Sequence, residues 1–543
     1  MYIVKQNISG RDYFYIRKAE RTGSKVRSKL VCYGGKTRED AERRLGELVG
    51  GERSVGAEKK DVSVEELAMF CKRKGFVYPS GEIYGGFAGF WDFGHLGVEM
   101  KNNLKNDWWN FHVRQREDVV GIDGSIITNP RVWEASGHVD SFSDVLVVCK
   151  KCKKPDKVDK NEIKKVKCVN CGGEFDWENL KDIKQMFEIS VGVDGKSYLR
   201  PETAQLIFAN FKFVQENARM KLPFGIAQIG KAFRNEIAPR DFLFRLREFE
   251  QMEIEYFVDP DEKCCYEVGD SEVLVFSEEM QVDGKEAVKM KFRDAQKKGI
   301  IKTVWHAYWL EQEFLWFTSL GADPDGFRIR QHISDEKSHY ALDTWDLEYK
   351  FPFGWKELQG MANRTDYDLA QHQKFSKSSM EIMNKDEKKI LPHVVCEPSQ
   401  GVERAFLVFL FDSYCYDEKR KNVVLKLHPR LSPVKAAIFP IVKGEEYEKV
   451  SQSIFDDLKK DWNVVYDKSG SIGRRYSRND EIGTPMCITV DGDTLKDESV
   501  TVRDRDTTEQ VRVKIKDLGK VVRDVVGGKG VLKFGKVVET RKK

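Results

Sequence analysis

The sequence predicts an α+β protein built from several domains. Its 543 residues exceed what one hydrophobic core organises, and this length indicates about three to four domains. Hydrophobic residues make up 40% of the chain and charged residues 33%, which supports sizeable cores and excludes a chain that is disordered throughout. A strand–loop–strand pattern between Phe233 and Phe257 and a strand–helix–strand alternation after residue 426 predict sheets covered by helices.

Charge and hydropathy exclude several classes of protein. Lys and Arg number 92 and Asp and Glu 88, so the chain is neither uniformly basic nor uniformly acidic. No apolar run approaches the roughly 18 residues of a membrane-spanning helix, and we expect no membrane partner. The stretch MYIVKQNISGRDYFY lacks the apolar core of a secretory signal. We therefore expect a cytoplasmic protein whose eleven Cys are reduced or metal-bound.

Residues 1–57 predict a small basic unit. DYFYIRKAERTGSKVRSKLVCYG is typical of two strands around a Thr-Gly turn, and a helix is expected to begin at Thr37 and end near Gly50. The unit has 13 basic and seven acidic residues. Two interpretations stay open, a solvated β-β-α appendage and a nucleic-acid contact surface.

Residues 149–180 predict a zinc ribbon. Cys149 and Cys152 form C-K-K-C, and Cys168 and Cys171 form C-V-N-C. Two knuckles at this spacing are typical of four thiolates that close a tetrahedral structural Zn²⁺ site. Chance pairing and redox C-x-x-C chemistry are the alternatives, and redox motifs usually act singly.

The remaining segments predict a large domain, a second domain and a tail. The large domain comprises residues 58–148 and 181–425, with a helical inserted subdomain at about 260–345. From 426 to 528, VKAAIFPIV, EEYEKVSQSIFDDLKKD and WNVVYD predict strand, helix and strand of an α/β layer. Residues 529–543 form a basic tail.

Four blocks of the large domain carry the residue types of an active site: LRPETAQ, FRNEIAPR with FRLREFEQMEIEYF, GWKELQGMANRTDYDL and EPSQGVERAFLVFLFD. Arg234 and Glu236 should share one side of a strand, where a surface salt bridge is the alternative to a site. For Glu253 the alternative is a side chain that faces solvent. For Ser399 the alternative is an N-cap of the helix that follows a turn, with no further role. Arg404, on an apolar helix, is costly to bury without a partner.

Together these blocks resemble the motifs of class II aminoacyl-tRNA synthetases, and they are most similar to the glycyl-tRNA synthetase family of the archaeal and eukaryotic dimeric type. The resemblance covers about residues 62–525. The helix and strand that end at Pro130 resemble motif 1, the dimer-forming element, FRNEIAPR through REF resembles motif 2, and EPSQGVERAFL resembles motif 3. YGGFAGFWDFG, LRPETAQ and SIGRRYSRNDEIGTP are similar to glycyl-specific sequence.

The resemblance implies a fold and a function. The fold is an antiparallel class II sheet flanked by helices, followed by an anticodon-binding domain at 426–528. The function is ATP-dependent ligation of glycine to tRNA(Gly), through glycyl-adenylate and release of pyrophosphate and without an editing domain. The implied partners are ATP with Mg²⁺, glycine, tRNA(Gly) and a second copy of the chain in a homodimer.

The resemblance also implies an ATP site. Arg234, Glu236 and Arg404 should be catalytic. Arg234 should contact the α-phosphate, Arg245 should reach the γ-phosphate, and Phe249 and Arg404 should sandwich adenine. Glu357 and Glu236 are the carboxylates expected to hold Mg²⁺ or to orient the nucleotide. The full set of ATP-binding residues comprises Arg234, Asn235, Glu236, Arg245, Leu246, Phe249, Glu357, Leu358 and Arg404.

Glycine recognition should depend on its ammonium group, because glycine has no side chain. The residues implied for this pocket are Glu202, Glu253, Glu397, Pro398 and Ser399, with Arg364 as a weaker candidate. Three carboxylates repel one another unless a cation joins them. Two residues depart from the family pattern: Leu206 stands where Gly is usual and Gln400 where Phe is common.

Two other functions remain possible at this point. One is a non-catalytic synthetase-like protein that binds nucleic acid, but such proteins typically lose the motif arginines and pocket carboxylates. The other is a class II synthetase for an amino acid such as proline or threonine, which the acidic pocket disfavours. Positive charge is concentrated in residues 1–57, 149–167 and 529–543, and these appendages are expected to meet tRNA.

Overall fold

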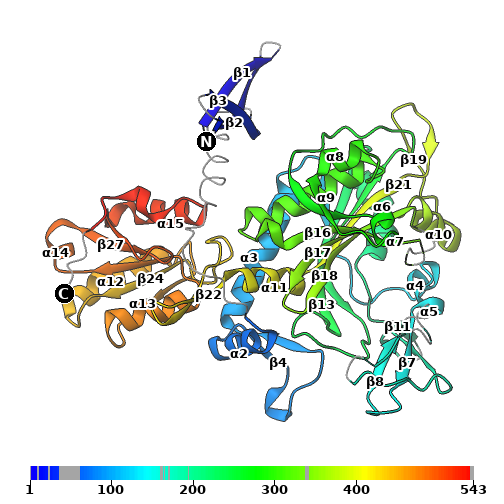
Figure 1. The fold of residues 1–543 in the computed structure, drawn as a ribbon, viewed down its shortest axis with the longest axis horizontal. Helices are drawn as coiled ribbons and strands as arrows, with labels where there is room; N and C mark the ends of the chain where they lie inside the picture. The colour runs from blue at the N-terminus through cyan, green and yellow to red at the C-terminus, as the bar shows by residue number, and fades with distance from the viewer. Residues whose placement is uncertain are drawn as a thin grey trace.

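A computed structural model of the chain describes residues 2–8, 11–22, 25–35, 62–158, 163, 166–168, 171–193, 195–334, 336 and 341–538. Beyond the N-terminal strands, Figure 1 shows a larger body and a smaller C-terminal domain, coloured orange to red. Among the described residues, no helix has both the length and the apolar character needed to cross a membrane.

The N-terminal strands form a three-stranded antiparallel sheet. β2 (Arg11–Thr22) pairs with β3 (Lys25–Gly35), and the pair Thr22–Lys25 closes the predicted hairpin. β1 (Tyr2–Ile8) adds a strand that the sequence had not indicated. The helix expected from Thr37 lies outside the described residues.

A nine-stranded sheet forms the centre of the larger body, in the order β15-β14-β16-β17-β18-β21-β13-β12-β6. Neighbours are antiparallel except β12 with β6 and β14 with β16. In chain order the strands are β6 (Val119–Ile122), β12 (Phe224–Phe233), β13 (Glu248–Val258), β14 (Glu272–Phe276), β15 (Val288–Lys291), β16 (Phe327–Gln331), β17 (Asp343–Phe351), β18 (Gly354–Asn363) and β21 (His393–Gly401).

Helices cover both faces of this sheet. α3 (His95–Trp109), α9 (Val304–Ser319) and α11 (Val402–Ser413) share one core with Met252 and Ile254 of β13. α6 (Ala204–Asn217) and α10 (Tyr367–Ser376) belong to a smaller core that includes strand residues of β12, β13 and β21. α9 is apolar nearly all round and is mostly buried, although Leu315 and Ser319 on its outer side are exposed.

Three expectations for this body are wrong in detail. β12 ends at Phe233 and β13 begins at Glu248, so Arg234 and Glu236 lie in the loop between two strands and not on a strand. The sequence EPSQG is the end of β21 and not a turn, because its backbone pairs with β13 and β18. The segment predicted as an inserted subdomain adds β14, β15 and β16 to the main sheet and packs into its core.

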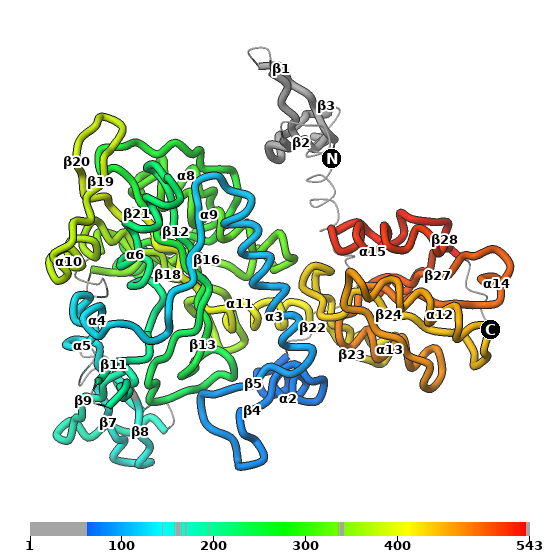
Figure 2. The backbone as a smooth tube through the Cα atoms, turned by 180° about the vertical axis from the view of Figure 1, so that it is seen from behind, coloured from blue at the N-terminus to red at the C-terminus, as the bar shows by residue number. Residues whose placement is uncertain are grey.

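The segment with the four Cys forms a small antiparallel unit. β7 (Ser143–Val148) lies between β8 (Pro155–Val158) and β9 (Lys181–Lys184). In both views this unit lies at the end of the larger body far from the C-terminal domain (Figures 1 and 2). The hairpin of β10 (Glu188–Val191) and β11 (Gly195–Tyr198) follows and leads back to the main domain.

The C-terminal domain is the α/β layer that the sequence predicted. Its sheet has the order β25-β24-β26-β27-β28. The strands are β24 (Ala436–Pro440), β25 (Val464–Tyr466), β26 (Met486–Val490), β27 (Ser499–Asp504) and β28 (Gln510–Lys514). The helices α12 (Glu445–Leu458), α13 (Ile472–Glu481) and α15 (Leu518–Val526) accompany it.

The connection between the two bodies is packed and hydrogen-bonded. Arg430 pairs with Asp107 of α3 at 3.0 Å, and Asn103 donates to the carbonyl of Ser432 at 3.0 Å. Leu427 and Leu431 are buried in the main core. In both views α3 and α11 lie on the side of the larger body that faces the C-terminal domain (Figures 1 and 2).

A buried polar cluster lies between α9 and the main sheet. Gln400 of β21 donates to Glu313 of α9 at 3.1 Å, and His112 Nε2 lies 3.3 Å from the other Glu313 oxygen. Burial raises the pKa of Glu313 to about 8, although Gln359 and Gln400 oppose the shift through hydrogen bonds. Burial and Arg116 hold the pKa of His112 well below its ordinary range. Gln400 is thus a hydrogen-bond donor to the buried cluster between α9 and the sheet.

We predict that E313Q stabilises the protein above neutral pH. The unfolded chain ionises Glu313 above its ordinary pKa of 4.5, but the folded chain does so only above about 8. Wild type should therefore lose stability relative to E313Q as pH rises between these values, by about 1.4 kcal/mol per pH unit at most. Chemical denaturation should show near-equal stability at pH 5 and an advantage of roughly 2–4 kcal/mol for E313Q at pH 8. E272Q, at an exposed residue of β14, is the control, and a constant difference across pH would contradict the prediction.

Candidate active site

Strand register assembles the centre of the site. Glu253 of β13 lies opposite Gln228 of β12 on one side and Ser399 of β21 on the other, and Ser399 lies opposite Gly360 of β18. A Cβ on Gly360 would meet no atom closer than 3.9 Å, so the space above this strand is open. Ser399 accepts a hydrogen bond from Gln251 at 3.3 Å and is not a helix cap, because α11 is capped by Gly401.

Three predicted carboxylates converge over this register. Glu253, 1% exposed, accepts the hydroxyl of Thr203. Glu397 reaches Arg364, and Glu202, which precedes α6, accepts from Gln205 at 3.1 Å. Glu253 therefore does not face solvent.

The electrostatics of the three carboxylates differ. Burial raises the pKa of Glu397 to about 8, although Arg364 opposes the shift. Burial and the charge of Glu202 also raise the pKa of Glu253. Burial acts in the same direction on Glu202, but His138, at 3.3 Å, with Arg364 and Arg234 outweighs it and holds the pKa of Glu202 well below its usual range. The pocket thus has more carboxylates than its fixed cations neutralise.

Arg364 organises the floor of the pocket, more centrally than the sequence suggested. It is 4% exposed and donates through Nη1 to both oxygens of Glu397 at 2.9 Å. Its Nε and Nη2 donate to Asp368 of α10 at 2.7 and 2.9 Å. A planar guanidinium can serve two carboxylates at once, and a lysine ammonium cannot reproduce that geometry.

The predicted phosphate contacts lie in the loop between β12 and β13. The guanidinium carbon of Arg234 lies 5.5 Å from the ring centre of Phe249. Arg234 Nε donates a hydrogen bond to the carbonyl of Pro201 at 3.0 Å. Arg245 pairs with Glu236 at 2.7 Å. Asn235 is held at its backbone N–H by the carbonyl of Gln185 at 2.7 Å.

Arg404, at the start of α11, lies against an aromatic ring and a carboxylate. Its guanidinium carbon lies 4.5 Å from the ring centre of Phe244, and Nη1 contacts Glu357 through the carbonyl at 2.9 Å and the carboxylate at 3.2 Å. Phe249 therefore has Arg234 beside it, and Phe244 has Arg404. Leu246 and Leu358 are 8% and 0% exposed, and both belong to the main core.

Two carboxylates near Glu357 were missed in the sequence. Asp346, opposite Gly360, and Glu348 lie on β17. Burial raises the pKa of Asp346 to about 6; Glu357 and Glu348 add to the shift, and His332, which pairs with Asp346 at 2.8 Å, opposes it. Asp346 and Glu348 are two residues apart on β17 and so share one face, and Glu357 lies on the next strand, β18. This spacing could have indicated the three carboxylates. Mg²⁺ at a nucleotide typically takes one or two carboxylates together with phosphate oxygens and waters, and these side chains could supply such ligands.

The four predicted zinc ligands come together. Cys149 Sγ lies 3.5 Å from Cys171 Sγ, and Cys152 Sγ lies 3.6 Å from Cys168 Sγ. All four sulfurs lie within 4.8 Å of one another. A zinc tetrahedron with bonds of about 2.3 Å has sulfur separations near 3.8 Å, so the residues fit this metal.

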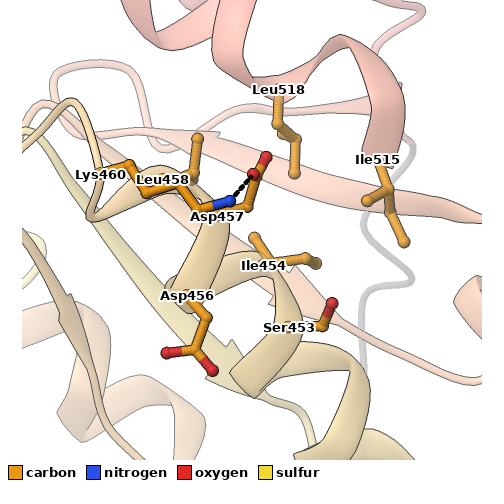
Figure 3. Close-up of a pocket in the computed structure, with 8 residues that line it drawn as sticks. All are labelled: Ser453, Ile454, Asp456, Asp457, Leu458, Lys460, Ile515 and Leu518. Carbon is orange, nitrogen blue, oxygen red and sulfur yellow. Dashed lines mark hydrogen bonds and ion pairs between the residues drawn. The ribbon is translucent and has the colours of Figure 1, made fainter.

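A groove on the C-terminal domain is separate from this chemistry. It has a volume of about 340 Å³ and lies between α12 and the start of α15 (Figure 3). Ile454, Leu458 and Leu518 line it together with Asp456 and the ion pair of Asp457 and Lys460. It contains none of the residues predicted for the active site.

Comparison with known proteins decides the family. The chain is 40% identical over 498 residues to the glycine–tRNA ligase of Thermobifida fusca, which covers 86% of this chain and 99% of that protein. It is 43% identical to the glycine–tRNA ligase of Bifidobacterium longum, over 86% of this chain and 93% of the relative. The corresponding ligase of Borreliella burgdorferi is 42% identical, over 84% and 96%.

The chain belongs to the glycine–tRNA ligase family. Residues 187–414 match the class II tRNA synthetase core domain shared by the G, H, P, S and T enzymes, and residues 435–525 match an anticodon-binding domain. As a class II aminoacyl-tRNA synthetase, the chain ligates glycine to tRNA(Gly). The predicted family, function and fold class are confirmed, and the two rival functions are set aside.

The geometry shows which active-site residues the sequence could not supply. His138, Thr203, Asp368 and Glu255 contact or adjoin the pocket; the last three lie within the quoted blocks, but nothing in the sequence assigned them a role. The sequence could have indicated Glu255, because it follows Glu253 by two residues and a strand places both side chains on one face. Thr203 and Asp368 belong to segments whose spatial neighbours only the fold defines.

Proposed function

We propose that glycine binds through its ammonium group between Glu202, Glu253 and Glu397. The observation that carries this assignment is the convergence of buried carboxylates on a pocket with Arg364 as their shared cation. An ammonium supplies the missing positive charge. Ser399 and the strands paired on either side of it are proposed to form the wall beside the α-carbon.

In the first step a glycine carboxylate oxygen attacks the α-phosphorus of ATP and pyrophosphate leaves. Arg234 is proposed to hold an α-phosphate oxygen as negative charge develops. Arg245 is proposed to contact the γ-phosphate. Its ion pair with Glu236 joins two parts of the loop between β12 and β13. Phe249 and Phe244 offer aromatic faces beside Arg234 and Arg404, which suits adenine stacking.

Glu357, with Asp346 and Glu348, is proposed to hold Mg²⁺ beside the phosphates. Bound Mg²⁺ would neutralise phosphate charge. In the second step the ribose hydroxyl of tRNA attacks the glycyl carbonyl and AMP leaves. No smaller amino acid exists, so we expect no editing domain.

We propose that the Lys-rich ribbon, the N-terminal unit and the tail contact tRNA. Because tRNA is used in translation, we propose that the protein acts in the cytoplasm.

We also propose a homodimer that forms along β6. β6 is the last strand of the main sheet, and beside it lies a groove of about 420 Å³ lined by strand residues and α6. Phe213 of α6 is 66% exposed in this groove, and Ile127 nearby is 45% exposed. An open strand edge with exposed apolar residues favours pairing with another chain, which agrees with the resemblance of this segment to motif 1.

E253Q should impair glycine activation and leave ATP binding largely intact. The amide keeps the shape but removes a charge that faces the ammonium, and charged hydrogen bonds contribute about 2–3 kcal/mol. We expect kcat/KM for glycine in pyrophosphate exchange to fall by about 30–150-fold. E272Q is the control. Unchanged glycine KM and kcat would contradict the pocket assignment.

Metal analysis should find one zinc per chain, and C168S should lose it. Removing one thiolate opens the tetrahedral site, and folding of the ribbon is coupled to metal binding. C265S, at an exposed cysteine outside the ribbon, is the matched control. Purified wild type without zinc would refute the site.

F213D should dissociate the dimer. A carboxylate in the apolar groove must be buried at the interface, and an unpaired buried charge costs several kcal/mol. Analytical ultracentrifugation should give the mass of two chains for wild type and of one for F213D. V193D, at a 97% exposed residue on the β10–β11 hairpin, is the control. A monomeric wild type, or a dimeric F213D, would contradict the proposed interface.

A further inference from the structure

Glu255 is a buried carboxyl group beneath the glycine pocket to which the reaction assigns no role. It lies on β13 on the same face as Glu253, and its side chain is 0% exposed. Neither carboxylate oxygen has a hydrogen-bond partner within the described structure. One oxygen each from Glu253, Glu255 and Glu397 lie within 4.8 Å of one another.

The charges around Glu255 do not balance if every acid is ionised. The groups that face it are Glu253 on its own strand, Cys396 and Glu397 on β21, Arg364, and Asp368 on α10. Arg364 is the one cation of this group, and it is already bonded to Asp368 and Glu397. Burial raises the pKa of Glu255 well above its usual range; Glu397 and Glu253 raise it further, and Arg364 opposes them only in part.

An isolated buried carboxylate costs so much free energy that such a group keeps its proton instead. A protonated carboxyl is a hydrogen-bond donor, and oxygens of Glu253 and Glu397, which can accept, lie within 4.8 Å of a Glu255 oxygen. A hydrogen bond donated to a carboxylate favours the ionised form of that carboxylate. Glu255 can therefore reduce the repulsion between its neighbours without adding charge.

We propose that Glu255 is a positioning residue that works as a neutral acid, donating its proton in a hydrogen bond to Glu253 or Glu397 so that both meet the glycine ammonium as carboxylates. This role rests on the glycine pocket proposed above. The ammonium contacts Glu253 and Glu397, and Glu255 acts through them.

Two substitutions separate a donor from a charge. E255Q keeps a donor and has no charge, so glycine KM should stay within about threefold of wild type. E255L has similar size but no donor, so glycine KM should rise at least about tenfold while ATP KM is unchanged. Loss of the donor also raises the pKa values of Glu253 and Glu397, so the acidic limb of kcat/KM for glycine should move to higher pH in E255L. E272Q and E272L are the matched controls.

The outcomes distinguish the alternatives. If E255Q is as impaired as E255L, a negative charge is needed and the proposal is overturned. If E255L leaves glycine KM and the pH profile unchanged, Glu255 has no positioning role. If E253Q and E397Q also leave glycine KM unchanged, the pocket assignment itself fails, and that failure is separate from the failure of this inference.

A second measurement does not depend on whether E255L folds. Infrared difference spectra of full-length wild type minus E255Q at pH 8 should contain the carbonyl stretch of one protonated carboxylic acid. Absence of that band would mean that Glu255 is ionised, which would overturn the proposal.

Discussion

Buried negative charge is the constraint on which the larger body depends. Arg364 is 4% exposed and joins Glu397 to Asp368 through two forked contacts. Removing one partner of a buried ion network leaves an uncompensated charge, which costs about 3–5 kcal/mol. This network therefore fixes the position of α10 relative to β21, and with it the depth of the pocket. In the proposed pocket, the glycine ammonium would complete the charge balance.

The sheet supplies the rigidity that a glycine pocket needs. Selection for an amino acid without a side chain depends on a wall that does not yield, since one methylene contributes only about 1–3 kcal/mol of discrimination in a compliant pocket. β13, β21 and β18 are hydrogen-bonded in register behind the pocket. On the other face, Gln400 and Glu313 tie β21 to α9. Gln400, where the family commonly has Phe, thus supports this part of the sheet from behind.

The proposed nucleotide site is built differently from the proposed glycine site. Its arginines lie on a loop and at the start of a helix, and each has an aromatic or carboxylate neighbour: Phe249 for Arg234, and Phe244 and Glu357 for Arg404. Loops can adjust around a large ligand, and a charged side chain that already has partners keeps its orientation. The ribbon and the anticodon-binding domain lie at opposite ends of the larger body (Figures 1 and 2), which suits contact with an extended polyanion.

The sequence by itself determined the family, the α+β class, the C-terminal α/β layer and the four Cys of the ribbon, because local spacing encodes these features. Motif residues such as Arg234, Glu253 and Arg404 were also readable, since their neighbours in the chain identify them. Tertiary structure alone decided what these residues meet. Strand pairing placed Ser399 in a strand beside Glu253, and a bend between β12 and β13 put Arg234 and Glu236 in a loop. Thr203, Glu255 and the pair Arg364–Asp368 come from three separate segments, so their convergence depends on strand order and helix packing, which no local pattern of residues specifies.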